Sequence, residues 1–118
     1  TESYQNQFVQ ASNSPVLLKS APSRYVSVGN GQCVAFLQAH GFEAYRGNAY
    51  EWDKYINSEI GWPGDAVLLD EGPYQHLALI LGTKDGYYIV EQNYEGLYIV
   101  SHRTIPFDYE KIVGFISK

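Results

Sequence analysis

The hydrophobic pattern predicts two short helices in the first half of the chain. The first begins near Gln32 and ends before Gly41, a residue suited to the left-handed conformation that closes many helices. The second covers 48–56, where Asn48 and Glu51 have the spacing of a capping box. The first helix is indicated by residues spaced three and four apart, namely Cys33, Phe36, Leu37 and His40.

The second half of the chain changes to short runs rich in β-branched and aromatic residues, each bounded by Gly, Pro, Asp or Asn. This composition is typical of strands. The connections are too short for helical crossovers, so we expect antiparallel pairing. Helices followed by closely linked strands predict an α+β fold, with the N-terminal helices packed on one antiparallel β-sheet. The predicted strands are 66–69, 76–81, 87–92, 97–101 and 112–116.

A chain of 118 residues is typical of one domain. Residues 1–27 are interpreted as an N-terminal arm or linker, partly packed, because they are polar at first and then punctuated by Pro15 and Pro22. Residues 28–118 form the predicted folded domain. The sequence has no Met, even at its start. We therefore expect a module of a longer protein or assembly with separate targeting modules.

Composition narrows the classes of partner. The formal net charge of -5 and the pI of about 5.0 leave no basic surface for nucleic acid or anionic membranes. No apolar run approaches the roughly 18 residues that a membrane span needs. We therefore expect no nucleic acid and no membrane insertion. A neutral or zwitterionic substrate, such as a peptide or glycopeptide, stays open.

Cys33 is the only cysteine, so it forms no internal disulfide and no cysteine-based metal cluster. A lone cysteine is either a small buried residue or a reactive nucleophile. The predicted place of Cys33 at the start of a helix favours the nucleophile, because the unpaired N–H groups and the helix dipole lower the pKa of a thiol. The same N–H groups can face a developing oxyanion.

A thiolate nucleophile needs a base within hydrogen-bond reach. His40 lies two turns along the predicted helix, about 10 Å from Cys33 along its axis, and is assigned to the helix end. His102 closes a predicted strand and is the weaker alternative. His76 opens a strand and is followed by the apolar run 77–81, which places it at the edge of the core. His76 is therefore the predicted base.

The residue that orients His76 depends on the register of one hairpin. If 83–86 form a four-residue loop, Gly82 pairs with Tyr87, and His76 and Ala78 fall opposite Asn93 and Glu91. Because side chains alternate across a strand, His76, Glu91 and Asn93 then share one face. A loop of odd length would separate them. Taken alone, each has a plain structural interpretation, Glu91 as a solvated strand residue and Asn93 as a turn residue.

Five short motifs then follow in an order that resembles a known family, the CHAP domain. These are cysteine- and histidine-dependent amidohydrolases and peptidases related to the NlpC/P60 group, and the resemblance covers about residue 28 to the end. The motifs are Gly31-Gln32-Cys33, Gly47-Asn48-Ala49 with Trp52, Pro63-Gly64-Asp65, His76-Leu77-Ala78 and Glu91-Gln92-Asn93.

The resemblance implies a papain-like α+β fold with the nucleophile at a helix N-terminus. By position it implies Cys33 as nucleophile, His76 as base, Glu91 as the orienting acid and Asn93 as an additional polar residue. Gln32, or the Cys33 N–H, is the oxyanion candidate. We interpret Trp52 with 47–49 as a helix start and a core aromatic. Beside the site, Tyr74 and Tyr94 are the predicted groove residues.

The implied activity is cleavage of an amide bond in peptidoglycan peptides, as an amidase or an endopeptidase. The enzyme would then be extracellular, periplasmic or virion-associated and act at the bacterial cell wall. Some members of the family carry an acidic calcium-binding segment before the cysteine. Residues 25–30 contain no carboxylate here, so we expect no calcium there, and no other metal or cofactor.

Three alternatives remain at the level of the sequence. A non-catalytic wall-binding or structural module would have a blocked groove or an unreactive Cys33. A thiol amidase with a different amide substrate would keep the same residues. A metal site built from Cys33, His76 and His102 is disfavoured, because these ligands have no paired spacing.

Overall fold

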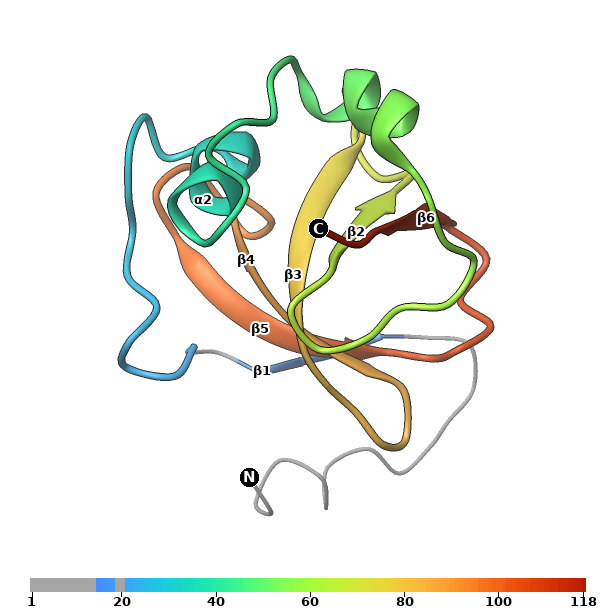
Figure 1. Ribbon diagram of the computed structural model, residues 1–118. Coiled ribbons are helices and arrows are strands. Elements are labelled where there is room, and N and C mark those ends of the chain that lie inside the picture. Colours follow the sequence, from blue (N-terminus) through green and yellow to red (C-terminus); the bar gives the residue numbers. More distant parts are fainter. Residues whose placement is uncertain (1–14, 19–20) are drawn as a thin grey trace.

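The computed structural model describes residues 15–18 and 21–118, which fold into an α+β domain with one antiparallel sheet (Figure 1). This confirms the predicted α+β class with one antiparallel sheet. The six strands lie in the order β1-β5-β4-β3-β2-β6. The elements are β1 (Val16–Leu18), α2 (Cys33–Ala39), the 3₁₀ helix η1 (Ala49–Tyr55), β2 (Ala66–Leu69), β3 (His76–Thr83), β4 (Tyr87–Gln92), β5 (Val100–Ile105) and β6 (Ile112–Ile116).

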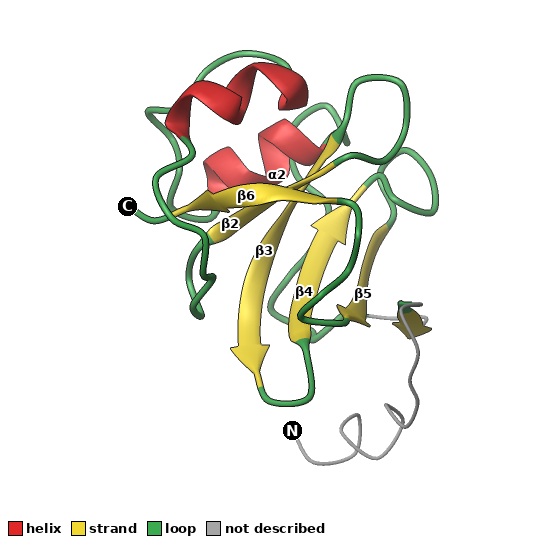
Figure 2. Ribbon diagram, turned by 90° about the vertical axis from the view of Figure 1, so that its right-hand side faces the viewer, coloured by secondary structure: helices red, strands yellow, loops and turns green. Residues whose placement is uncertain are grey.

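Both helices lie on the same face of the sheet (Figure 2). Phe36 and Leu37 of α2 are completely buried against the apolar residues of β2, β3 and β4. Trp52 of η1 is also completely buried, and its Nε1 donates to the Gly47 carbonyl at 3.2 Å. The interpretation of Trp52 as a core aromatic is therefore confirmed. This packing fixes the start of α2 over the sheet.

The helix boundaries agree with their sequence signals. Gly41 follows α2 with a φ of +109°, a left-handed conformation that favours glycine. At the start of η1, the Asn48 N–H donates to Glu51 Oε1 at 2.7 Å, the bond that a capping box predicts. None of the helices in the described part of the chain is long and apolar enough to cross a bilayer.

The opposite face of the sheet holds a second apolar cluster that includes Val67, Ala78, Ile89 and Phe115. Alternating residues of β2, β3 and β4 therefore enter two different cores, which explains why these strands are apolar on both faces. Polar side chains that are buried on this second face need partners. They gather at one end of the sheet, where the candidate site lies.

Strand β1 was not predicted. Val16–Leu18 pairs antiparallel with β5, so part of the segment 1–27 is an edge strand of the sheet. Three residues are too few to show a period of two, and only the partner strand defines this element. The predicted polar arm over residues 1–14 lies outside the described residues, as do residues 19 and 20.

The predicted strand 97–101 is wrong, because the strand is β5, from Val100 to Ile105. Residues 97–99 belong to the preceding turn, although they are apolar. There Tyr98 has a φ of +69°, and its N–H donates to the Gly31 carbonyl at 3.1 Å. This contact ties the turn to the segment before α2. His102 consequently lies inside β5 and does not close a strand.

The predicted pairing of Gly82 with Tyr87 is also wrong. Thr83 pairs with Tyr87, so the loop has three residues and not four. An irregularity between Ile80 and Gly82 then shifts the register by one, and Leu79 pairs with Val90. The two offsets cancel, so the register near His76 is the predicted one. His76 and Glu91 consequently share a face.

Candidate active site

Cys33 is the first residue of α2, and 8% of it is exposed. The segment before it is held by Gln92 of β4, a completely buried residue. Gln92 Nε2 donates to the carbonyls of Val28 and Gln32, both at 3.0 Å, and Gln92 Oε1 accepts from the Val28 N–H at 2.8 Å. These bonds position the start of α2 beside the sheet. Sequence reasoning gave Gln92 no role.

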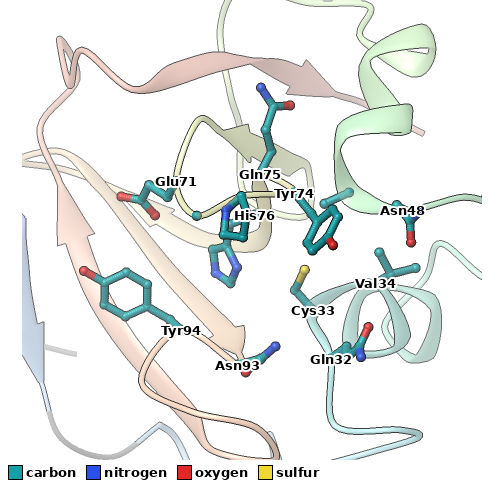
Figure 3. A pocket seen from close by; sticks show the side chains of 13 residues that line it. Gln32, Cys33, Val34, Asn48, Glu71, Tyr74, Gln75, His76, Asn93 and Tyr94 are labelled. Atoms are coloured by element: carbon teal, nitrogen blue, oxygen red, sulfur yellow. The ribbon is translucent and has the colours of Figure 1, made fainter.

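His76 is the first residue of β3 and lies beside Cys33 (Figure 3). Its Nε2 is 2.8 Å from Glu91 Oε1. The other ring nitrogen, Nδ1, is therefore the one left for the hydrogen bond between His76 and the Cys33 thiol. The structure brings Cys33, His76 and Glu91 together in the predicted order.

The electrostatics of this group favour a charged pair. Burial by itself raises the pKa of the Cys33 thiol, but the hydrogen bond and charge of His76, with the Leu77 N–H, bring that pKa below its ordinary value. Burial lowers the pKa of His76, whereas its bonds to Cys33 and Glu91 raise it to about 9. Both shifts favour a thiolate–imidazolium pair of Cys33 and His76.

Glu91 is completely buried and has a second partner that the sequence analysis missed. Arg103 of β5 is also completely buried, and its Nε donates to Glu91 Oε2 at 2.8 Å. Arg103 also forms an ion pair with Glu71, which lies in the turn between β2 and β3. Because the predicted strand ended at residue 101, Arg103 fell outside it and this contact was missed. Strand parity would have shown it, because Ile89 pairs with Arg103 and Glu91 with Ser101 on one face.

Glu71 has a further contact, a hydrogen bond from the Tyr109 hydroxyl. Arg103 and Tyr109 together hold the pKa of the Glu71 carboxyl below its usual value although burial raises it. The site therefore continues from Cys33 through His76 and Glu91 to Arg103 and Glu71. Each charged side chain in this series has an oppositely charged neighbour, which compensates for the cost of its burial.

A cleft of about 680 Å³ opens over Cys33 and His76. Its walls come from the start of α2, the start of η1, the 71–75 turn and the beginning of the β4–β5 turn (Figure 3). A cleft of this size accommodates a short peptide or a similar small molecule. The lining residues are Gln32, Cys33, Val34, Asn48, Ala49, Glu71, Gly72, Pro73, Tyr74, Gln75, His76, Asn93 and Tyr94.

The remaining predicted site residues all line this cleft. Gln32 is exposed beside Cys33, and Tyr74 is 65% exposed on the opposite wall. Asn93 has a φ of +72°, which agrees with a turn residue, and the residue bonded to His76 is Glu91. The Tyr94 ring stacks under the Arg103 guanidinium, 3.6 Å from its central carbon. Tyr94 thus supports the site as well as lining the cleft.

The other two histidines lie away from Cys33. His40 Nδ1 is 2.8 Å from the Phe36 carbonyl at the end of α2, as expected. His102 pairs across from Val90, on the opposite face of the sheet from Glu91, and contacts the Tyr88 hydroxyl. His102 does not line the cleft at Cys33, and the thiol is hydrogen-bonded to His76 instead. Among residues 15–18 and 21–118, no group of three His, Cys, Asp or Glu residues could hold a metal ion.

Comparison with known proteins gives a fold-level neighbour. A crystal structure of Ly7917 is similar to this chain, with a TM-score of 0.59 and 23% sequence identity. The similarity covers 78% of this chain and 55% of that one, so the chain spans about half the length of Ly7917. At this identity the likeness concerns the fold alone. No protein-family model matches the sequence, and no curated protein matches it.

Proposed function

We propose that this protein is a cysteine amidohydrolase or peptidase that cleaves an amide bond in peptidoglycan peptides. The observation that carries the proposal is the Cys33–His76–Glu91 chain at the wall of an open cleft. A thiol with a lowered pKa, a base bonded to it and an acid that orients the base are what nucleophilic amide hydrolysis requires.

In the proposed reaction, the Cys33 thiolate attacks the amide carbonyl carbon. The His76 imidazolium donates its Nδ1 proton to the leaving nitrogen, the C–N bond breaks, and an amine departs from a thioester. Neutral His76 then takes a proton from water, which attacks the thioester. Collapse of this second intermediate releases the carboxylic acid and restores the thiolate–imidazolium pair. Glu91 holds His76 by Nε2, so that Nδ1 faces Cys33.

The choice of substrate and family rests on the resemblance to CHAP domains and on their papain-like arrangement. The motif residues Cys33, His76 and Glu91 meet at one site, and Cys33 begins a helix packed on the sheet. The open cleft argues against a purely structural module, for which a blocked groove is expected. The place of action proposed with this function is the bacterial cell wall, reached as an extracellular, periplasmic or virion-associated enzyme with other modules for targeting.

Digestion of purified peptidoglycan from a Gram-negative and a Gram-positive source tests the proposal. The wild-type chain is compared with Cys33→Ala, and the released fragments are analysed by mass spectrometry. Fragments that disappear with Cys33→Ala would support the thiol mechanism, and their masses would distinguish amidase from endopeptidase cleavage. Absence of release from both sources, while Cys33 still reacts rapidly with a thiol reagent, would favour a different amide substrate.

A further inference from the structure

Arg103 lies at the centre of the charged residues behind the cleft. Its guanidinium makes four hydrogen bonds, two to each of two carboxylates. Nε and Nη2 donate to Glu91 at 2.8 and 3.1 Å, and Nη1 and Nη2 donate to Glu71 at 3.1 and 2.5 Å. The Tyr94 ring covers one face of the guanidinium. A planar fork of donors is required for this geometry, so a lysine could not reproduce it.

The two carboxylates belong to different parts of the site. Glu91 is bonded to His76, inside the sheet. Glu71 lies in the turn that forms one wall of the cleft. The guanidinium therefore connects the wall of the cleft to the acid that orients the base.

We propose that Arg103 is the positioning residue of this site, which holds the Glu91 carboxylate directed at His76 and joins that pair to the cleft wall through Glu71. The inference rests on the proposed function for its catalytic meaning. Arg103 acts on His76 through Glu91, because Glu91 and not Arg103 is hydrogen-bonded to His76.

Loss of Arg103 should disfavour the Cys33 thiolate. Arg103 is a cation bonded to the carboxylate that contacts His76, so its removal leaves the surroundings of Cys33 more negative. Removal also frees the Glu91 carboxylate from the two hydrogen bonds that direct it, which loosens its bond to His76. Both effects oppose the negative charge on Cys33.

The charged and titratable groups around His76 are contributed by several elements. Cys33 comes from α2, Glu91 from β4 and Arg103 from β5, while Glu71 and Tyr109 come from turns. His102, on the opposite face of the sheet, contributes only a longer-range interaction with Glu91. Arg103 is the permanent cation within this group, so its removal is the sharpest perturbation.

The test is the rate of Cys33 alkylation by iodoacetamide as a function of pH, in the full chain. We expect the midpoint of this profile to rise by about one pH unit or more in Arg103→Met. Arg103→Lys should also raise it, by less, because an ammonium keeps the charge without spanning both carboxylates. Glu71→Gln removes an anion and should move the midpoint downward. Tyr109→Phe removes a neutral hydrogen bond at the same place and should leave the midpoint unchanged.

Circular dichroism identifies the variants that fold. If Arg103→Met does not fold, Arg103→Lys and Glu71→Gln decide the question. A folded Arg103→Lys with the wild-type midpoint would overturn the positioning role. The readout needs no substrate, so it is separate from the proposed function. Shifted midpoints without peptidoglycan cleavage would leave the role of Arg103 intact and refute only the assigned substrate.

Discussion

The Gln92 side chain holds the backbone of Val28 from both sides, accepting from its N–H at 2.8 Å and donating to its carbonyl at 3.0 Å. The residues are 64 positions apart in the sequence. Since the same amide also reaches the Gln32 carbonyl, Gln92 fixes the approach to Cys33 without contacting the thiol.

Gln92→Leu should therefore weaken both the fold and the site. The substitution removes three hydrogen bonds, one from the Val28 N–H and two to the carbonyls of Val28 and Gln32. We expect their loss to lower the free energy of unfolding by about 1–3 kcal/mol. The Cys33 alkylation rate should fall as well, because the start of α2 is no longer fixed. Urea denaturation and iodoacetamide kinetics measure the two effects.

Gln38→Leu is the matched control for this change. Gln38 lies in α2, the helix that begins at Cys33, and its Nε2 also donates to a backbone carbonyl, that of Tyr45 at 2.7 Å. It should lower stability without changing the alkylation rate. Equal losses of Cys33 reactivity in both variants would contradict a specific role for Gln92.

Cys33→Ser should lower the pKa of His76 from about 9. The wild-type value depends on the hydrogen bond and charge of Cys33 as well as on Glu91, and serine supplies no anion at neutral pH. NMR titration of the His76 ring signals measures this change. An unchanged pKa would mean that Glu91 alone sustains the imidazolium.

The same variant has a consequence for stability. A histidine whose folded pKa is raised above its unfolded value of about 6.5 stabilises the fold fully below that value. This contribution is lost as pH rises through the folded pKa. In the wild type the loss attributed to His76 is complete only above about pH 9, whereas in Cys33→Ser it should end at lower pH. Urea unfolding at a series of pH values follows the difference.

The cleft should discriminate against negatively charged peptides. Among the described residues that line it there is no Lys or Arg, and Glu71 is a carboxylate. Tyr74→Lys places a cation on the exposed wall and should lower KM for a substrate with a free carboxylate by up to about fivefold. The KM for the carboxamide form of the same peptide should change little. Tyr50→Lys, at an exposed site that does not line the cleft, is the control.

Gly31 allows the close approach of Tyr98 next to Cys33. Its φ is +83°, and a Cβ at this position would lie 2.7 Å from the Tyr98 ring. Gly31→Ala should therefore cost more than the roughly 1–2 kcal/mol of a left-handed residue and should disturb Cys33. Gly64→Ala is the control, because Gly64 also has a positive φ but a Cβ added there would lie within 4 Å of no other atom. Equal costs in urea denaturation would show that Tyr98 simply moves aside.

Much of this site could be anticipated from local signals. The position of Cys33 at a helix start and the apolar run after His76 are local patterns, and both agree with the structure. Arg103 and Gln92 could not be anticipated in the same way. Their roles depend on which strand lies beside which, and a β5 predicted three residues too early placed Arg103 outside the sheet. The Val16–Leu18 strand likewise exists only through its neighbour.

The irregularity between Ile80 and Gly82 in the β3–β4 hairpin decides which face of the sheet His76 occupies relative to Glu91. If the pairing of Thr83 with Tyr87 continued along the hairpin without this irregularity, His76 would fall opposite Tyr94, and every side chain of β3 before residue 81 would lie on the other face relative to β4. His76 would then point away from Glu91 while the apolar residues of β3 exchanged cores. Changes to this hairpin, by evolution or by design, are therefore constrained to keep the pairing register that places His76 and Glu91 on one face.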